Sequence, residues 1–190
     1  MNTPIFKEKS EFQAAVYTGT AGFDTQVAYA ATDNLGFMMN GSFEFDSESK
    51  FLENYFLELG TGYFEKMGAK GVVEFYGGAG FGSIERLSPD VNSFRAFIQP
   101  ALGWSFKTVE LSIAHRVVYV NVNQNSISKS AVFFEPAFTV KGGFKNVKLV
   151  MQGGISLHAI PEDIEFDYEP LMISLGIQAR LNKKKDTRTP

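Results

Sequence analysis

Alternation of apolar and polar residues runs through almost the whole of this chain, and it limits the fold more than any other feature. In residues 171–181 every second side chain is apolar, and the residues between them, apart from Met172, are polar or small. Side chains of a β-strand point alternately to its two faces, so such a segment forms a strand with one apolar face. The expected strands lie near residues 11–19, 22–31, 35–45, 54–66, 72–86, 93–106, 109–121, 131–145, 146–158 and 169–181. These ten strands, with no helical period between them, predict an all-β fold.

The connections between the expected strands alternate between short and long. Tight turns follow the even-numbered strands, at residues 33–34, 67–71, 107–108 and 145–146. Longer polar segments follow the third, fifth, seventh and ninth strands, at residues 46–53, 87–92, 122–130 and 159–168. Most of the strands exceed the roughly 9–11 residues that a tilted strand needs to cross a bilayer. An even number of long strands, with short turns at one end and long loops at the other, is typical of barrels in the bacterial outer membrane.

The two faces of the expected strands differ in a way that indicates which one faces outward. The apolar face is large and rich in aromatic residues, as a lipid-facing belt would be. The polar face carries Gln, Glu and Arg together with many glycines, which suit the crowded lumen of a small barrel. We therefore predict a closed up-and-down antiparallel transmembrane β-barrel of about ten strands, with a polar lumen and an apolar outer belt.

Composition and charge set further limits. The chain has 190 residues, no cysteine and a formal net charge of −3. It therefore forms no disulfide, and without a basic patch we expect no binding of nucleic acid. We expect one barrel domain over residues 11–181, with a loosely ordered periplasmic segment before it at residues 1–10 and a polar tail after it at residues 182–190.

Location and cofactors follow from the same interpretation. A barrel of this kind belongs in the bacterial outer membrane, with membrane lipid around it and an envelope protein as a further partner. Export to that membrane needs a signal peptide, and we expect that it has been removed from this sequence. No residue pattern predicts a cofactor.

Several short segments resemble small outer-membrane β-barrel proteins of Bacteroidota-type bacteria. The segments are residues 4–6, 22–29, 74–78, 98–101, 134–137 and 176–181. The resemblance covers nearly the whole chain and implies an outer-membrane barrel. Such proteins are often lipid-anchored at an N-terminal cysteine, and most have no established activity. This chain lacks that cysteine, and its final strand ends in Leu181 rather than in an aromatic residue.

Two prolines fall inside expected strands, Pro100 after Gln99 and Pro136 after Glu135. Proline cannot donate a hydrogen bond to the neighbouring strand, and a closed barrel has no edge at which to place it. We therefore expect each proline to mark a bulge or a local gap in strand pairing.

Charged and amide side chains of the polar face converge at one height of the predicted barrel. Counting from the tight turns places Gln99 opposite Arg116, with Glu135 close to Arg116 on the next strand and Glu58 at a similar height. Because buried charges persist when they are paired and hydrogen-bonded, we predict a mid-lumen network of these four residues. The network is either a polar plug, which the narrow lumen of so few strands favours, or a charged constriction that selects ions or a small ligand.

Signals for catalysis or metal binding are weak. Ser156 and His158 share a face near the outer mouth beside acidic residues, which would suit a rim hydrolase, but no oxyanion donors are identifiable and we predict no enzyme activity. Alternating carboxylates that could hold a divalent cation are Asp163, Glu165 and Asp167. The only other histidine, His115, falls in the apolar phase of its strand, which we attribute to an error in strand phase.

Two functions from different classes remain open. In the first, the barrel is a structural, accessory or surface-binding membrane protein whose lumen is largely filled by side chains. In the second, it is a ligand-binding barrel, either a small pore or a soluble lipocalin-like calyx with its apolar face inside. The sequence names neither a ligand nor a partner.

Overall fold

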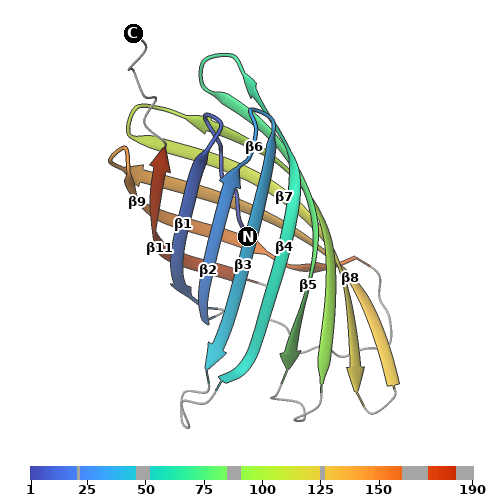
Figure 1. Ribbon diagram of the computed structural model, residues 1–190. Helices are drawn as coiled ribbons and strands as arrows, with labels where there is room; N and C mark the ends of the chain where they lie inside the picture. The colour runs from blue at the N-terminus through green and yellow to red at the C-terminus, as the bar shows by residue number, and fades with distance from the viewer. Residues whose placement is uncertain (21, 46–51, 85–90, 125–126, 160–170, 183–190) are drawn as a thin grey trace.

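A computed structural model shows an antiparallel β-barrel (Figure 1). It describes the whole chain except residues 21, 46–51, 85–90, 125–126, 160–170 and 183–190. The strands in chain order are β1 (Glu11–Gly19), β2 (Gly22–Ala30), β3 (Leu35–Phe45), β4 (Leu52–Met67), β5 (Gly71–Ile84), β6 (Asn92–Ser105), β7 (Val109–Gln124), β8 (Ile127–Gly143), β9 (Val147–Ile155), β10 (Leu157–His158) and β11 (Leu171–Asn182). Within these ranges no helix is long and apolar enough to cross a membrane.

Each strand pairs with its neighbours in the sequence, and the first and last strands pair with each other. β1 lies antiparallel to β11, from Glu11 opposite Asn182 to Gly19 opposite Ser174, which closes the barrel. β9 and β10 occupy one place in the wall, because both pair with β8 and only Ser156 separates them. The wall therefore has ten strand positions, and the predicted closed up-and-down antiparallel barrel is confirmed.

The observed strand ends differ from the predicted ones mainly at the long connections. β7 extends to Gln124 and β8 begins at Ile127, so most of the loop predicted at residues 122–130 is strand. The pairing continues to the end, with Asn123 opposite Ser128 and Gln124 opposite Ile127. The polar composition of this segment predicted a loop, but polar residues are compatible with a strand that is paired along its whole length.

Both prolines mark local gaps in pairing, as predicted. Between β6 and β7 the pairing passes from Ile98–Val117 to Ala101–Ala114 without a change of register, and it omits Pro100. Between β8 and β9–β10 it passes from Phe134–Leu157 to Ala137–Gly154, again without a shift, and it omits Pro136. In each case the other side of the proline stays paired, with Phe75 and with His115 respectively. The missing proline N–H thus removes a rung of the ladder without bulging the strand.

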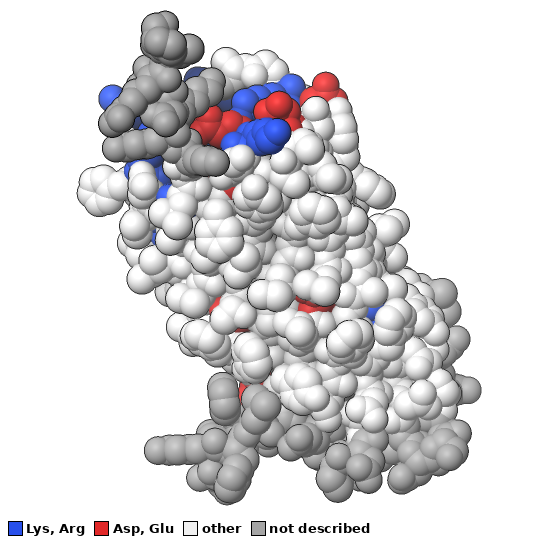
Figure 2. Space-filling model, in the orientation of Figure 1, with Lys and Arg blue, Asp and Glu red and all other residues white. Residues whose placement is uncertain are grey.

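The two faces of the wall are arranged as predicted, with apolar side chains outside and polar side chains inside. Large side chains such as Leu59, Phe81 and Leu149 are 60–69% exposed, whereas Gln13, Glu74 and Gln99 on the inner face are buried. The uncharged side chains cover the waist of the barrel, and charged ones gather at the end of the barrel where β11 ends (Figure 2). Lys66, Lys70, Lys107 and Lys145 are exposed at the tight turns.

His115 belongs to the outer face. Its side chain is exposed, and its ring stacks on that of Phe134 with centroids 5.6 Å apart and planes 8° apart. The interpretation of its position as an error in strand phase is therefore wrong. The aromatic neighbour gives the imidazole ring a contact that compensates in part for its place among apolar side chains.

The N-terminal segment lies inside the barrel, where the sequence predicted a loosely ordered segment outside it. Asn2, Thr3, Ile5 and Phe6 are all buried, and Figure 1 places the N-terminus among the strands. That prediction is wrong because a ten-stranded wall encloses more space than its own side chains fill. At the other end of the chain, Asn182 belongs to β11, and the rest of the predicted tail lies outside the described residues.

Glycines of the inner face leave room in the lumen for the large side chains that pack there. A substitution at Gly78 tests this role. A Cβ at Gly78 would lie 2.2 Å from the carbonyl oxygen of Leu59 and 2.7 Å from the Phe97 ring, whereas one at Gly77 meets only the carbonyl oxygen of Phe97 at 3.6 Å. We expect Gly78→Ala to lower the free energy of unfolding by about 1–3 kcal/mol through overpacking. Urea unfolding of the refolded barrel, followed by its mobility on a gel, measures the loss.

The matched control is Gly77→Ala on the same strand, which should change stability by less than about 0.5 kcal/mol. Equal effects at the two positions would show that the space beside Gly78 is unimportant.

Candidate functional site

An ion pair crosses the middle of the lumen. Arg116 on β7 donates from Nη2 to Oε2 of Glu58 on β4 over 2.7 Å, and both side chains are 6% exposed. These strands are not neighbours in the wall, so the contact spans the interior. The guanidinium of Arg116 also lies over the ring of Phe97, 3.8 Å from its centroid. A cation–π contact in a desolvated site adds to the attraction of the carboxylate.

Of the four residues predicted to form a mid-lumen network, the structure joins two directly. Glu135 stands opposite Arg116 in the register of β7 and β8, but its carboxylate accepts a hydrogen bond from Ser156 Oγ at 3.4 Å. Gln99 donates to the carbonyl oxygen of Asn2 at 2.7 Å. The predicted contacts of these two residues with Arg116 are therefore replaced by contacts with other groups. Binding of a ligand by the four residues stays a prediction.

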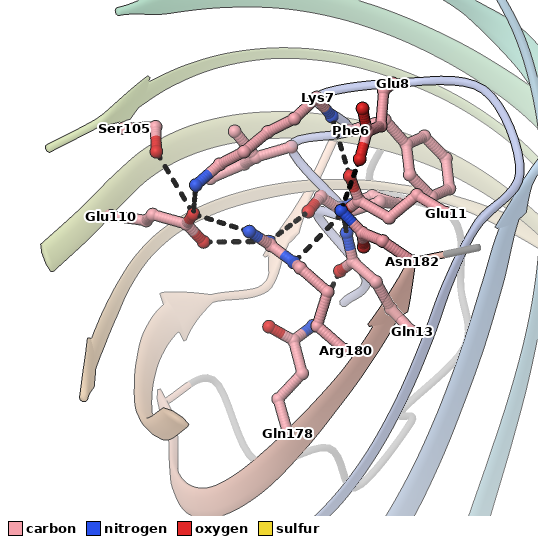
Figure 3. Close-up of polar contacts among 12 residues, drawn as sticks. Phe6, Lys7, Glu8, Glu11, Gln13, Ser105, Glu110, Gln178, Arg180 and Asn182 are labelled. Carbon is pink, nitrogen blue, oxygen red and sulfur yellow. Dashed lines mark hydrogen bonds and ion pairs between the residues drawn. The ribbon is translucent and has the colours of Figure 1, made fainter. Parts of the chain in front are cut away.

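A second and larger cluster lies at the end of the barrel that carries the tight turns (Figure 3). Its centre is Glu110, which has no exposed surface. Arg180 donates to both of its oxygens, at 2.7 and 2.9 Å, and Lys148 and Lys7 place their ammonium groups 3.3 and 2.7 Å from Oε1. Arg180 also reaches Glu11 through Nε at 2.9 Å. Three cations around one buried carboxylate satisfy a charge that would otherwise be costly to bury.

The sequence contained a signal for this cluster. Glu110, Lys148 and Arg180 all belong to the polar phase of their strands, and each lies within a few residues of a tight turn or the C-terminal tail. Residues at one height of a barrel share its lumen, so charges near the same end could have been grouped. Lys7 could not have been added in this way, because the N-terminal segment has no strand period.

Main-chain atoms of the N-terminal segment bind side chains of the surrounding wall. The carbonyl oxygen of Met1 accepts from Gln152 at 2.7 Å, that of Asn2 from Gln99 at 2.7 Å, and that of Thr3 from Lys141 at 2.7 Å. Further along, the N–H groups donate to carboxylates instead. Ile5 N–H donates to Glu74 at 2.9 Å, and Lys7 N–H donates to Glu11 at 3.0 Å.

Two apolar side chains of the segment fit against glycines of the wall. A Cβ at Gly36 would lie 2.8 Å from the Phe6 ring, and one at Gly103 would lie 2.9 Å from Ile5 Cγ1. The Phe6 ring also packs on Phe64, with centroids 5.1 Å apart. Ile5 has a φ of 54°, which costs a β-branched residue about 1–3 kcal/mol and persists only where its surroundings enforce it. The wall and the segment are therefore shaped to each other.

Cavities at the loop end of the barrel rest on this segment. One has a volume of about 120 Å³ and includes Asp24, Glu58, Arg95 and Arg116 in its lining; the other is about 40 Å³. Met1 borders both of them. The segment thus separates these cavities from the turn end of the lumen.

The residues predicted for catalysis and metal binding are only partly described. Ser156 Oγ donates to Glu135, while the ring of His158 packs on that of Phe133 with centroids 5.2 Å apart. In the part of the chain that the structure describes, no hydrogen bond joins Ser156 to His158, and no three His, Cys, Asp or Glu side chains group as metal ligands. The candidate ligands Asp163, Glu165 and Asp167 lie outside the described residues.

Comparisons with known proteins add little at the level of sequence. No family model matches the chain, and no curated protein sequence matches it. Among solved structures, the chain is similar to the N-terminal β-barrel domain of OprF from Pseudomonas aeruginosa. The TM-score is 0.38 at 13% identity, and the similarity covers 92% of this chain and 100% of that one. The narrower resemblance to Bacteroidota-type proteins, and the lipid anchor it implies, stay predictions.

The contribution of the Arg116–Glu58 ion pair to stability can be measured by removing the guanidinium. We expect Arg116→Ala to lower the free energy of unfolding by about 3–5 kcal/mol, because it leaves a buried carboxylate without its nearest partner. Urea unfolding of the barrel in lipid vesicles measures the change.

Arg95→Ala is the matched control. This second guanidinium is 26% exposed and lies 3.9 Å from Glu58, so its removal should cost less than about 1 kcal/mol. Similar losses for the two arginines would contradict the assignment of Arg116 as the main partner.

Proposed function

We propose that this protein is a bacterial outer-membrane β-barrel with a sealed lumen and a non-catalytic role that is structural, accessory or surface-binding. The observation that carries the proposal is the division of the wall into two faces. Large apolar side chains cover its outside, and the polar inside is closed by ion pairs and by the N-terminal segment. Exposed apolar surface on this scale is typical of contact with membrane lipid or a partner.

The alternative of a soluble calyx does not fit this arrangement. A calyx would hold the apolar phase inside and expose Glu58, Arg116, Glu135 and Gln99, but all four are buried and the apolar phase is exposed. The soluble calyx is therefore wrong, because the strands close with their polar face toward the lumen and their apolar face outward. The sealed interior likewise favours the polar plug over a conducting constriction.

A second candidate function is binding of a small ligand at the loop end. It is favoured by the cavity of about 120 Å³, whose lining includes both Arg95 and Arg116 together with Asp24 and Glu58. Groups of both signs there would suit a small molecule that carries both charges. In either role we expect lipid around the belt and an envelope protein as a further partner.

The experiment that tests the main proposal is a gel of outer-membrane fractions, run with and without boiling, from cells that express the protein with an export leader. A folded barrel in that fraction should migrate differently before and after boiling, and the purified protein should give no stepwise conductance in a planar bilayer. A protein recovered in solution without detergent would contradict membrane insertion, and steady conductance would contradict a sealed lumen.

The depth dependence of an outward charge tests the belt itself. Leu59 in the middle of β4 and Met67 at its turn end are both exposed on the outer face. Leu59→Arg should lower the free energy of unfolding in vesicles by about 2–4 kcal/mol, and Met67→Arg by about 0–1 kcal/mol, because the cost of a charge falls toward the interface. The two variants are compared by urea titration in the same lipid. Equal costs would argue against a bilayer around β4.

A further inference from the structure

We propose that the lumen is a binding site for an extended peptide, and that residues 1–7 are its displaceable occupant. The first observation is that the wall recognises the main chain of this segment. Carbonyl oxygens at four successive positions accept from wall side chains, and N–H groups at the next three donate to wall carboxylates. The side chains involved are Gln26, Gln152, Gln99, Lys141, Arg180, Glu74 and Glu11.

These contacts differ from those that hold a strand in the wall. Strands pair through their main chains, whereas the segment is held by side chains that reach inward from β1, β2, β5, β6, β8, β9 and β11. An extended chain gripped through its main-chain atoms, with pockets for a few side chains, is bound as a peptide ligand is bound. The glycines at Gly36 and Gly103 supply the two pockets, for Phe6 and Ile5.

The second observation concerns what the site would contain once the segment left it. The groups that bind the main chain of the segment are carboxylates, amides and an ammonium group, including Glu74, Gln99 and Lys141, and all three are buried in the lumen. Water can satisfy such groups, so the emptied lumen would be hydrated rather than collapsed. The side chains of Ile5 and Phe6 meet apolar residues of the wall, among them Phe64, whereas the main chain of the segment meets polar groups.

The third observation is the position of the segment along the barrel. Lys7 lies in the cluster around Glu110 at the turn end, and Met1 borders the cavities at the loop end. Departure of the segment would therefore join those cavities to the turn end of the lumen. The segment closes the barrel together with the ion pairs, and an empty site would leave a narrow polar passage beside the Arg116–Glu58 pair.

The test separates the segment from the wall after the full chain has folded. Glu8 and Lys9 are both exposed, so a recognition sequence for a site-specific protease can be inserted between them. The intact variant should show the heat-dependent gel shift and no conductance. After cleavage and washing, mass spectrometry should show loss of the peptide, and stepwise conductance should appear in a planar bilayer.

A synthetic peptide of residues 1–9, added back, should abolish this conductance. A peptide that carries Ile5→Asp and Phe6→Asp should need at least about a tenfold higher concentration, because each substitution removes a buried apolar contact. Retention of the cleaved peptide through washing would overturn the proposal, as would its loss without conductance or equal block by the two peptides.

A tethered variant keeps the test independent of any effect of the insertion. Thr3 and Ser112 have their hydroxyl oxygens 2.9 Å apart, and the chain has no cysteine, so Thr3→Cys with Ser112→Cys offers a single disulfide. When oxidised, the tether should prevent both release and conductance after cleavage, and reduction should restore them. Conductance that is unchanged by oxidation would contradict the role of the segment.

The inference rests on the proposed membrane barrel only for the conductance measurement. Binding of a fluorescently labelled peptide of residues 1–9 to the cleaved, washed barrel in detergent micelles tests the peptide site directly. If the protein failed to insert into bilayers but bound this peptide more tightly than the doubly substituted one, the membrane proposal would fall and the peptide site would stand.

Discussion

Polar side chains of the inner face are cut off from bulk water by a wall whose outside is apolar, so each of them needs a partner within the barrel. This requirement explains how the main charged groups of the interior are arranged. Glu110 collects three cations at the turn end, and Arg116 reaches across the lumen to Glu58. Where the wall supplies no partner, the N-terminal segment supplies carbonyl oxygens and N–H groups, as for Lys141 and Glu74.

The glycines of the inner face also help to fill the lumen, because they leave room for large neighbouring side chains. A lumen of ten strands is wider than short side chains can bridge but too narrow for a second layer of large ones. Alternation of Gly with bulky residues resolves the conflict: Gly78 makes room for Phe97, and Gly36 makes room for Phe6. The ring of Phe97 then supports the guanidinium of Arg116. A larger residue at Gly78 would therefore displace the Phe97 ring and, through it, the guanidinium that pairs with Glu58.

How far the sequence predicts this structure depends on whether a feature is local in the chain. Strands, tight turns and the gaps at Pro100 and Pro136 follow from side-chain period and from proline's missing N–H, and they were predicted except for the strand ends within residues 122–130. The placement of Glu135 beside Arg116 also followed from counting along a hairpin. The contact of Arg116 with Glu58 did not follow from such counting. Which side chains meet across the lumen depends on closure of the whole barrel. The N-terminal segment has no period, so nothing in its own residues predicted its burial.

The two faces of the wall determine different aspects of function. The outer face determines where the barrel resides, since apolar side chains at positions such as Leu59 and Phe81 need lipid or a partner around them. The inner face determines whether anything passes through, and its ion pairs lie at two heights, in the cluster at Glu110 and at Glu58. With the segment in place, its main-chain contacts with the wall are not available to another molecule. Departure of the segment would change that, because the main-chain contacts at Gln99 and Lys141 would then be open to another extended chain.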